Sequence, residues 1–212
     1  LLDGLRLADG DNEGLTLDQV KTIEARRGNL SWWRVYGEGL IGSLEGNIYP
    51  EWAQIEEVDR HARLERYGLD FGYTHDPTAI IGIYKLNDRY ILNEVCYQKG
   101  LSNKQIADIL NNIDRALVIA DSASPKDIDE LRTYGINILP AEKGPDSVLH
   151  GIQLVQDQKI DVTKRSTNIV KENSNYQWMR DKMTGQYINQ PGEIWNHSMD
   201  AIRYAMSSII KK

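Results

Sequence analysis

Three aspartates lie where the surrounding residues predict buried structure, and together they could hold metal ions. Asp70 lies inside the apolar stretch 67–71, whose composition predicts a short buried strand. Asp121 directly follows the apolar residues 117–120, at the carboxyl end of another predicted strand, and Asp200 lies in the first turn of the last predicted helix. An ionised carboxylate inside a sheet is costly unless another charge or a metal compensates it, so Asp70 requires a partner.

The layout of an α/β sheet would bring these three carboxylates together. Ligands gather at the carboxyl ends of strands in such sheets, and Asp70 and Asp121 would lie side by side if their strands are neighbours. A helix packed on the sheet could place Asp200 at the same point. Converging carboxylates raise one another's pKa values and therefore favour bound cations, and their hard oxygens suit Mg²⁺ or Mn²⁺. Two such ions about 4 Å apart would support the attack of water on a phosphodiester.

Each aspartate also has an ordinary structural explanation. Asp70 could begin a turn, Asp121 could cap the helix that follows it, and Asp200 could favour the N-terminus of its own helix. Both interpretations stay open for each residue taken singly. The metal hypothesis, however, explains all three with one site.

Three further residues could assist such a site. His197 precedes Asp200 by three residues, so both project from one helix face; the histidine could be a metal ligand, a proton carrier, a phosphate contact or a packing residue. Asp76 follows Asp70 by six residues and could support the metal ligands without touching an ion, or belong to an ordinary Asp-Pro turn. Lys126 could contact a phosphate or simply lie on a solvated helix face.

The elements that must position these residues follow from the hydrophobic pattern. Strands are predicted at 66–72, 78–86, 89–98, 115–123, 136–143 and 159–163, and helices from 102, at 124–135, 146–156 and 166–181, and from 196 to the end. Three hairpin strands followed by alternating strands and helices imply an α/β fold with a mixed sheet covered on both faces.

The composition suits one such domain and excludes several classes of protein. The chain has 212 residues, a single Cys and a net charge of −6, so a disulfide framework and a cysteine zinc site are both excluded, as expected for a reducing cytoplasm. Most of the negative charge lies in residues 1–66, so the charge neither suggests nor excludes a nucleic-acid partner. No apolar run has the length of a membrane span, and no signal sequence opens the chain.

The first part of the chain differs in character from the rest. Residues 1–65 predict a linker and helical lead-in that packs on the core, and residues 66–212 predict the main domain. The lead-in is rich in aromatic side chains, which favour packing on the main body over stacking on bases: Trp32, Trp33, Tyr36, Tyr49 and Trp52. Because the chain begins without Met, we expect it to be a domain excised from a longer protein.

Four sequence blocks resemble, in order and spacing, the carboxy-terminal nuclease domain of the large terminase subunit of tailed double-stranded DNA bacteriophages. They are "GLDFGYTHDPTAIIGI", "LVIADSASPKDIDELRTYGINI", "KGPDSVLHGIQLVQ" and "NHSMDAIRYA". The resemblance covers residues 66–210. It implies a ribonuclease H-like fold and a metal-dependent endonuclease that cuts concatemeric viral DNA during genome packaging.

The resemblance also implies roles for individual residues. Asp70, Asp121 and Asp200 match the family's metal ligands for two Mg²⁺ or Mn²⁺ ions, and His197 matches a position near the metals. The segment 159–163 falls where the family has a hairpin thought to regulate the access of DNA.

In that family the nuclease works on double-stranded DNA together with an ATPase motor domain of the same protein, a small terminase subunit and the portal. The resemblance therefore places this chain in the host cytoplasm at the procapsid, neither secreted nor bound to a membrane. No G-x-x-x-x-G-K-[ST] motif occurs here, so we expect this chain to cut DNA without translocating it.

Three other interpretations stay open at this stage. Ribonuclease H-like phosphotransferases of the resolvase or transposase type need related carboxylates. A degenerate domain could dock DNA or the portal without catalysis. A sugar-kinase or actin-like ATPase would explain "LDFGYT" as a phosphate-binding hairpin, although the second glycine-rich loop of that fold is missing.

Overall fold

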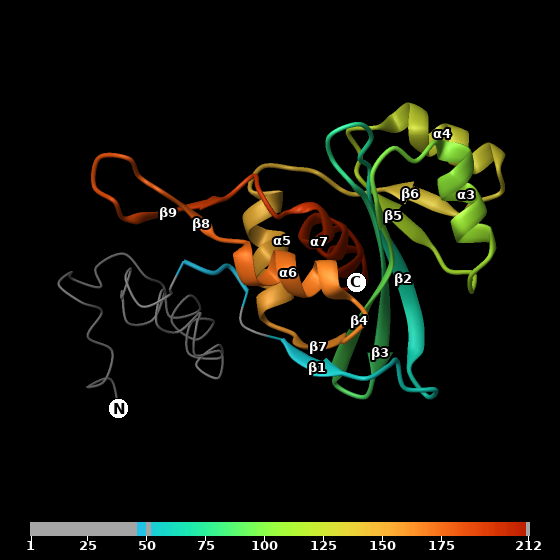
Figure 1. Cartoon of the computed structure of the whole chain (residues 1–212), viewed down its shortest axis with the longest axis horizontal. Coiled ribbons are helices and arrows are strands. Elements are labelled where there is room, and N and C mark those ends of the chain that lie inside the picture. The colour runs from blue at the N-terminus through green and yellow to red at the C-terminus, as the bar shows by residue number, and fades with distance from the viewer. Residues whose placement is uncertain (1–45, 50–51, 211–212) are drawn as a thin grey trace.

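The computed structural model describes residues 46–49 and 52–210, which form a mixed sheet with helices on both faces (Figure 1). The sheet has seven strands in the order β1-β7-β4-β3-β2-β5-β6. Its strands are β1 (Ala53–Ile55), β2 (Arg63–Asp70), β3 (Thr78–Leu86), β4 (Arg89–Gln98), β5 (Val118–Ala120), β6 (Ile138–Pro140) and β7 (Lys159–Thr163). Strands β2, β3 and β4 form an antiparallel meander, and the other neighbours pair in parallel, so the predicted mixed α/β sheet is confirmed.

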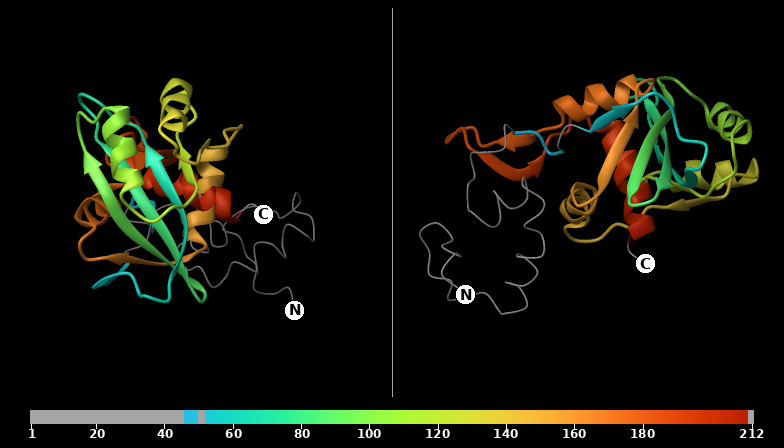
Figure 2. Two further views of the ribbon diagram at one scale, coloured as in Figure 1. Left: turned by 90° about the vertical axis from the view of Figure 1, so that its right-hand side faces the viewer. Right: turned by 90° about the horizontal axis from the view of Figure 1, so that it is seen from below.

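The helices divide between the two faces of this sheet (Figure 2). One face carries α3 (Asn103–Asn111) and α4 (Pro125–Thr133); the other carries α5 (Ser147–Gln156), α6 (Thr167–Asn175) and α7 (His197–Ile210). Successive side chains of a strand point to opposite faces. Accordingly, Ile80 of β3 packs in the core beneath α3 and α4, whereas Ile81 and Ile83 pack in the core beneath α7. The described residues thus form a large apolar core on each face of the sheet.

Local sequence signals set several boundaries as predicted. Strands β3 and β4 coincide with the predicted ranges 78–86 and 89–98. Helix α3 begins at a capping box, in which the Ser102 hydroxyl accepts from the Gln105 N–H and the Gln105 side chain accepts from the Ser102 N–H. Gly135 stops the segment after α4 with a φ of +84°, a left-handed conformation that glycine adopts without steric cost.

Helix α7 lies very close to β2, and one glycine makes that approach possible. A Cβ atom at Gly68 would lie 1.9 Å from the backbone oxygen of Ala201 in α7, a distance that no side chain tolerates. The helix therefore runs directly over the strand that ends at Asp70.

The structure corrects the prediction for segment 159–163. This segment is a strand as predicted, but it lies inside the sheet between β1 and β4 and pairs in parallel with both, so it is not an access hairpin. Its side chains Ile160 and Val162 are buried at 4% and 1% exposure, which gives them a core role. The hairpin outside the main sheet is formed instead by β8 (Trp178–Arg180) and β9 (Tyr187–Pro191).

The predicted helix 166–181 is also too long. Helix α6 ends at Asn175, and Tyr176 turns to an extended conformation with a φ of −78° and a ψ of 104°. Tyr176 is buried at 1% exposure, with its ring centroid 5.8 Å from that of Tyr49. Burial of this large ring competes with continuation of the helix, and the chain leaves as β8.

The described residues before β2 contribute to the core as well. Tyr49 and Trp52 are buried, with ring centroids 5.3 Å apart, and β1 pairs with β7 at the edge of the sheet. Trp32, Trp33 and Tyr36 lie outside the described residues. The division into a lead-in and a main domain at residue 65 stays a prediction.

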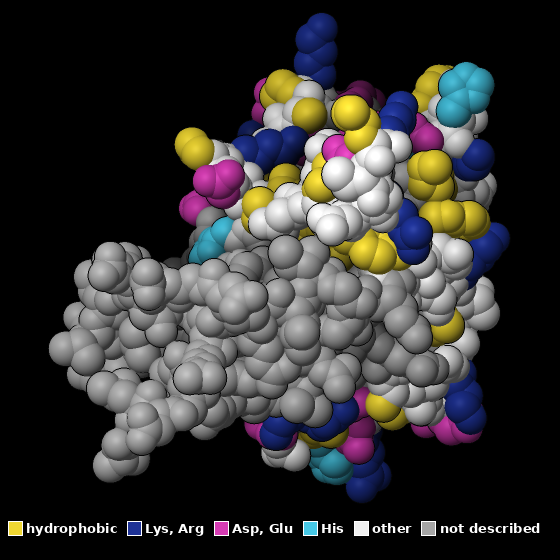
Figure 3. Space-filling view, turned by 90° about the vertical axis from the view of Figure 1, so that its left-hand side faces the viewer, with side chains coloured by type: hydrophobic (Ala, Val, Ile, Leu, Met, Phe, Trp, Pro, Cys, Tyr) yellow, Lys and Arg dark blue, Asp and Glu magenta, His cyan; other side chains and the backbone are white. Residues whose placement is uncertain are grey.

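The surface at the end of the molecule where the β8–β9 hairpin lies is mixed in character. Its described part combines hydrophobic, basic and acidic side chains (Figure 3). The hairpin contributes exposed apolar groups, among them Met179, Met183 and Ile188. Among the helices that the structure describes, none has the length and apolarity that crossing a lipid bilayer would require.

Candidate active site

Asp70 and Asp121 lie side by side at the ends of two neighbouring strands. Strands β2 and β5 pair in parallel with Leu69 opposite Ala120, so the next residue of each strand is an aspartate. The backbone N–H of Asp121 donates to the carbonyl oxygen of Leu69 at 3.1 Å, which extends the ladder to this point. The predicted neighbourhood of these two residues is therefore confirmed.

Asp200 reaches the same region from α7. Its N–H donates to the Asn196 carbonyl at 2.7 Å in the first turn, and α7 lies over β2 at Gly68. Burial is the largest influence on Asp70, and it raises the pKa of this carboxyl to about 6, with the charges of Asp200 and Asp121 acting in the same direction and His197 against it. The structure thus brings the three carboxylates within electrostatic reach of one another.

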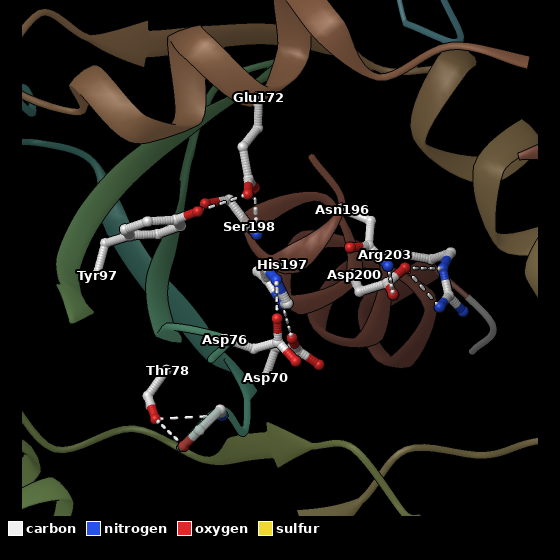
Figure 4. Close-up of polar contacts among 11 residues, drawn as sticks. Asp70, Asp76, Thr78, Tyr97, Glu172, Asn196, His197, Ser198, Asp200 and Arg203 are labelled. Carbon is white, nitrogen blue, oxygen red and sulfur yellow. Dashed lines mark hydrogen bonds and ion pairs between the residues drawn. The ribbon is translucent and has the colours of Figure 1, made fainter. Parts of the chain in front are cut away.

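His197 lies between two carboxylates (Figure 4). Its Nδ1 is 3.0 Å from Oδ2 of Asp70, and its Nε2 is 3.6 Å from Oδ1 of Asp76. The hydrogen bond to Asp70 raises the pKa of His197, against the effect of burial, which lowers it. The imidazole therefore joins Asp70 and Asp76, two of the residues that the sequence pointed to.

Two basic side chains that the sequence reasoning missed balance the other aspartates. Lys143 Nζ lies 2.5 Å from Oδ1 of Asp121, and Arg203 Nη2 lies 2.8 Å from Oδ1 of Asp200. Arg203 follows Asp200 by three residues, a helical spacing at which opposite charges meet, so the sequence held a signal for this pair. Lys143 comes from the loop after β6 and carried no such signal.

A buried glutamate, also missed, anchors the start of α7. Glu172 of α6 is 1% exposed; its Oε2 accepts from the Ser198 N–H at 2.5 Å, and its Oε1 accepts from the Tyr97 hydroxyl at 2.7 Å (Figure 4). A carboxylate at a helix N-terminus satisfies a free N–H and complements the helix dipole. Glu172 therefore holds in place the first turn of α7, which carries His197 and Asp200. Its position in the middle of a predicted helix gave no hint of this contact.

A family model described as a terminase RNase H-like domain matches residues 70–208 of this chain. The chain belongs to this family. The matched range runs from Asp70, the last residue of β2, through most of α7 and includes all six residues singled out from the sequence. The family resemblance seen in the four sequence blocks is therefore confirmed, as is the ribonuclease H-like fold.

Curated relatives of this terminase domain are large terminase subunits. The chain is 36% identical over 202 residues to the terminase large subunit of Bacillus phage SPP1, a match that covers 88% of this chain and 47% of the relative. It is 30% identical over 147 residues to the PBSX phage terminase large subunit of Bacillus subtilis strain 168, covering 66% of this chain and 34% of the relative. The chain thus spans about half the length of the curated relatives it matches, or less.

Solved structures show the same fold. The nuclease domain of the SPP1 large terminase, with bound Mn, has a TM-score of 0.67 and 30% identity, and the match covers 78% of this chain and 99% of that one. The P22 large terminase nuclease domain has a TM-score of 0.62 at 19% identity, covering 81% of this chain and 94% of that one. The large terminase of a thermophilic bacteriophage in complex with ADP has a TM-score of 0.71 at 22% identity, covering 95% and 54%.

The carboxylates of this terminase domain are suitable ligands for a divalent metal, but they are not arranged as a preformed coordination site. Within 46–49 and 52–210, no three His, Cys, Asp or Glu side chains converge on one point in the way a metal ion needs. Asp121 and Asp200 instead face the cations Lys143 and Arg203. Hard carboxylate oxygens on three adjoining elements fit Mg²⁺ or Mn²⁺, provided that they turn from these partners.

Lys126 is exposed, whereas Asp121 has a further local contact. The exposed Lys126 lies in the first turn of α4, and no described carboxylate forms an ion pair with it. Asp121 Oδ1 accepts from the N–H of Ala123 at 3.1 Å, so this carboxylate also shapes the turn after β5. A phosphate contact by Lys126 stays a prediction.

Proposed function

We propose that this chain is the nuclease domain of a large terminase subunit and that it cuts concatemeric viral double-stranded DNA during genome packaging. The observation that carries the proposal is the meeting of Asp70 and Asp121 at the ends of paired strands, with Asp200 brought over them by α7. Membership of the terminase RNase H-like family and the 30% identity to the SPP1 nuclease domain with bound Mn support it.

Asp70, Asp121 and Asp200 would hold two Mg²⁺ or Mn²⁺ ions in this proposal. Bound there, the ions would activate water and stabilise the leaving oxygen of a phosphodiester. The chain's own residues would provide the setting: the charges of both other aspartates act on Asp70, and His197 Nδ1 lies 3.0 Å from its Oδ2. Lys143 and Arg203 balance Asp121 and Asp200 in the structure, and once released from them they would be available to a substrate phosphate.

The wider role follows from the relatives. Because the matched large terminases are about twice as long as this chain, we infer an ATPase motor domain as its partner, consistent with the ADP complex of the thermophilic phage relative. The small terminase subunit and the portal would complete the packaging assembly, in the host cytoplasm at the procapsid. Asp76 would assist through its contact with His197, and Lys126 through a phosphate contact.

Plasmid cleavage tests the proposal directly. Supercoiled DNA is incubated with the chain and Mn²⁺, Mg²⁺ or EDTA, using wild type, Asp121→Asn and the matched control Asp129→Asn, whose carboxylate lies on the solvated face of α4. Nicking that needs metal, disappears in Asp121→Asn and persists in Asp129→Asn is expected. Cleavage by Asp121→Asn at the wild-type rate would show that the site is assigned to the wrong residues.

A docking module without catalysis is the second candidate, and the pairing of Asp121 with Lys143 and of Asp200 with Arg203 is what favours it. In such a module the ion pairs would be permanent. Calorimetric titration with Mn²⁺ separates the two: a nuclease shows saturable binding that Asp121→Asn weakens, whereas a docking module shows none.

A further inference from the structure

A groove adjoins the candidate active site on the α7 face of the sheet. It has a volume of about 600 Å³ and lies between β5, β6, α5 and α7, so we call it the α5–α7 groove. Its floor is apolar and includes Ile119 and Leu139. At one end lies Ala141, whose N–H donates to the carbonyl of Ala120 at 2.7 Å, directly beside Asp121. The groove therefore adjoins the strand end that carries Asp121.

Arg66 lines this groove from β2. Alternate side chains of a strand share a face, so Arg66, Gly68 and Asp70 all lie on the α7 side of β2. The Nε of Arg66 is buried, and no acceptor in the part of the chain that the structure describes forms a hydrogen bond with it. A partly buried guanidinium without that bond is well suited to an anionic ligand, since buried polar groups require partners.

Arg203 joins the groove to the active site. It lines the groove while its Nη2 and Nε donate to Oδ1 of Asp200. Space for its stem depends on Gly151 of α5, where a Cβ atom would lie 2.7 Å from Arg203 Cγ. The guanidinium is thus held between α5 and α7 at the point where the groove meets the carboxylates.

Hydroxyl groups and an imidazole complete the polar wall. The groove is lined further by Ser147, His150, Tyr204, Ser207 and Ser208, and by one carboxylate, Glu142. Arg203 is engaged with Asp200, so Arg66 is the guanidinium of the groove that offers an unpaired donor, and hydroxyl groups such as that of Ser207 stand with it in the lining. Such a set of donors matches a phosphate in hydrogen bonding. The apolar floor would suit the sugar to which that phosphate is attached.

We propose that the α5–α7 groove binds a backbone phosphate of the DNA strand that enters the active site, with Arg66 as its main contact and Ser207 and Ser208 beside it. This inference rests on the proposed function, because the nuclease substrate supplies the phosphate. Arg66 precedes Asp70 by four strand positions, or roughly 13 Å at 3.3 Å per residue. The bound phosphate would therefore lie within a few nucleotides of the one attacked.

The test measures binding of the full chain to a fluorescein-labelled DNA duplex by anisotropy, in EDTA and at several salt concentrations. Arg66→Gln should weaken binding about tenfold and make the slope of log K against log salt shallower by about one. Arg66→Lys, which keeps the charge, should recover most of the affinity. The control is Arg63→Gln on the same strand, whose guanidinium is exposed and paired with Glu65; it should bind as wild type does.

A second variant covers the case in which Arg66→Gln does not fold. Ser208 is partly exposed near the end of α7, so Ser208→Glu should fold and should weaken binding by placing a negative charge in the groove. Wild-type affinity and salt slope in the folded variants would overturn the proposal. So would saturable binding of inorganic phosphate that depends on Arg66 while duplex affinity does not, since the groove would then hold free phosphate.

Binding and cleavage separate this inference from the proposed function. A chain that binds duplex through Arg66 yet never cuts plasmid with any metal would support the groove and overturn the nuclease. A chain that cuts plasmid, with Arg66→Gln binding and cutting as wild type does, would support the nuclease and overturn the groove.

Discussion

The two faces of the sheet are built on different principles. The face under α3 and α4 is packed with apolar side chains such as Leu131 and Ile106, and its helices begin and end at local signals. The α7 face has an apolar core as well, but it also carries buried charged groups, among them Asp70, Glu172 and Arg203. Burying charged groups is costly unless they are paired. The α7 face therefore contributes less to the stability of the fold and carries the candidate active site, whereas the opposite face mainly contributes stability.

The greatest effect is expected from separating α7 from β2. Gly68→Ala would push a Cβ atom into the Ala201 backbone, so we expect a loss of about 3 kcal/mol or more in the free energy of unfolding, and loss of cleavage as Asp200 moves away. Urea denaturation and plasmid cleavage measure both. The control Gly82→Ala lies on β3, where a Cβ atom would meet the end of the Tyr84 side chain at 2.9 Å, and that side chain can move. Equal effects of the two variants would contradict the special role of the α7–β2 contact.

Substitution of Glu172 can show whether this residue positions the active site in addition to stabilising the fold. Glu172→Gln removes the charge that holds the first turn of α7, so we expect about 2 kcal/mol of destabilisation and about a tenfold fall in the cleavage rate. Glu94→Gln is the matched change, because Glu94 accepts from the N–H groups of Asn168 and Ile169 at the start of α6. It should destabilise the fold to a similar extent but leave the cleavage rate within about twofold. A similar loss of cleavage in both variants would mean that Glu172 acts only through stability.

Asp70 provides a test in which function and stability move in opposite directions. Burial raises the pKa of Asp70 from 3.8 to about 6, so the folded protein holds this proton more tightly than the unfolded chain does. The resulting stabilisation of the folded state is complete below about pH 4 and is lost as the pH rises through about 6. Asp70→Asn should therefore be more stable than wild type by about 1–3 kcal/mol at pH 8 in EDTA, with the difference fading towards pH 4. Thermal unfolding across this pH range measures it. Cleavage should be lost in the same variant, and lower stability at pH 8 would show that Asp70 is a structural residue.

The weakest effect is expected on the α3–α4 face. Ser102→Ala removes the capping box of α3 and should cost about 1 kcal/mol in stability. Because α3 lies on the face opposite the carboxylates, the cleavage rate and duplex affinity should remain those of wild type. A fall in either would show that the two faces are coupled.

Helix and strand boundaries could be predicted where contacts between residues close in sequence define them, and not where contacts between distant residues do. Ser102, Pro125 and Gly135 act within a few residues, so the start of α3 and both ends of α4 could be predicted from the sequence. The end of α6 could not, since Tyr176 leaves the helix to pack on Tyr49, more than a hundred residues away. Segment 159–163 shows the same limit, because its strand character is local but its place between β1 and β4 is not.

For the site, the aspartates could be found from the order of residues alone, because a charge inside an apolar pattern is visible without a structure. Asp70 and Asp121 were singled out in this way, and Asp200 and His197 by their place and spacing in the last predicted helix. Their partners depend on the folded arrangement: Lys143 reaches Asp121 from another loop, Glu172 reaches Ser198 from another helix, and Arg66 faces a groove that four elements enclose. The sequence shows which charged residues lie in an apolar pattern and are therefore costly to bury. Which group compensates each of these charges depends on distances that only the folded structure defines.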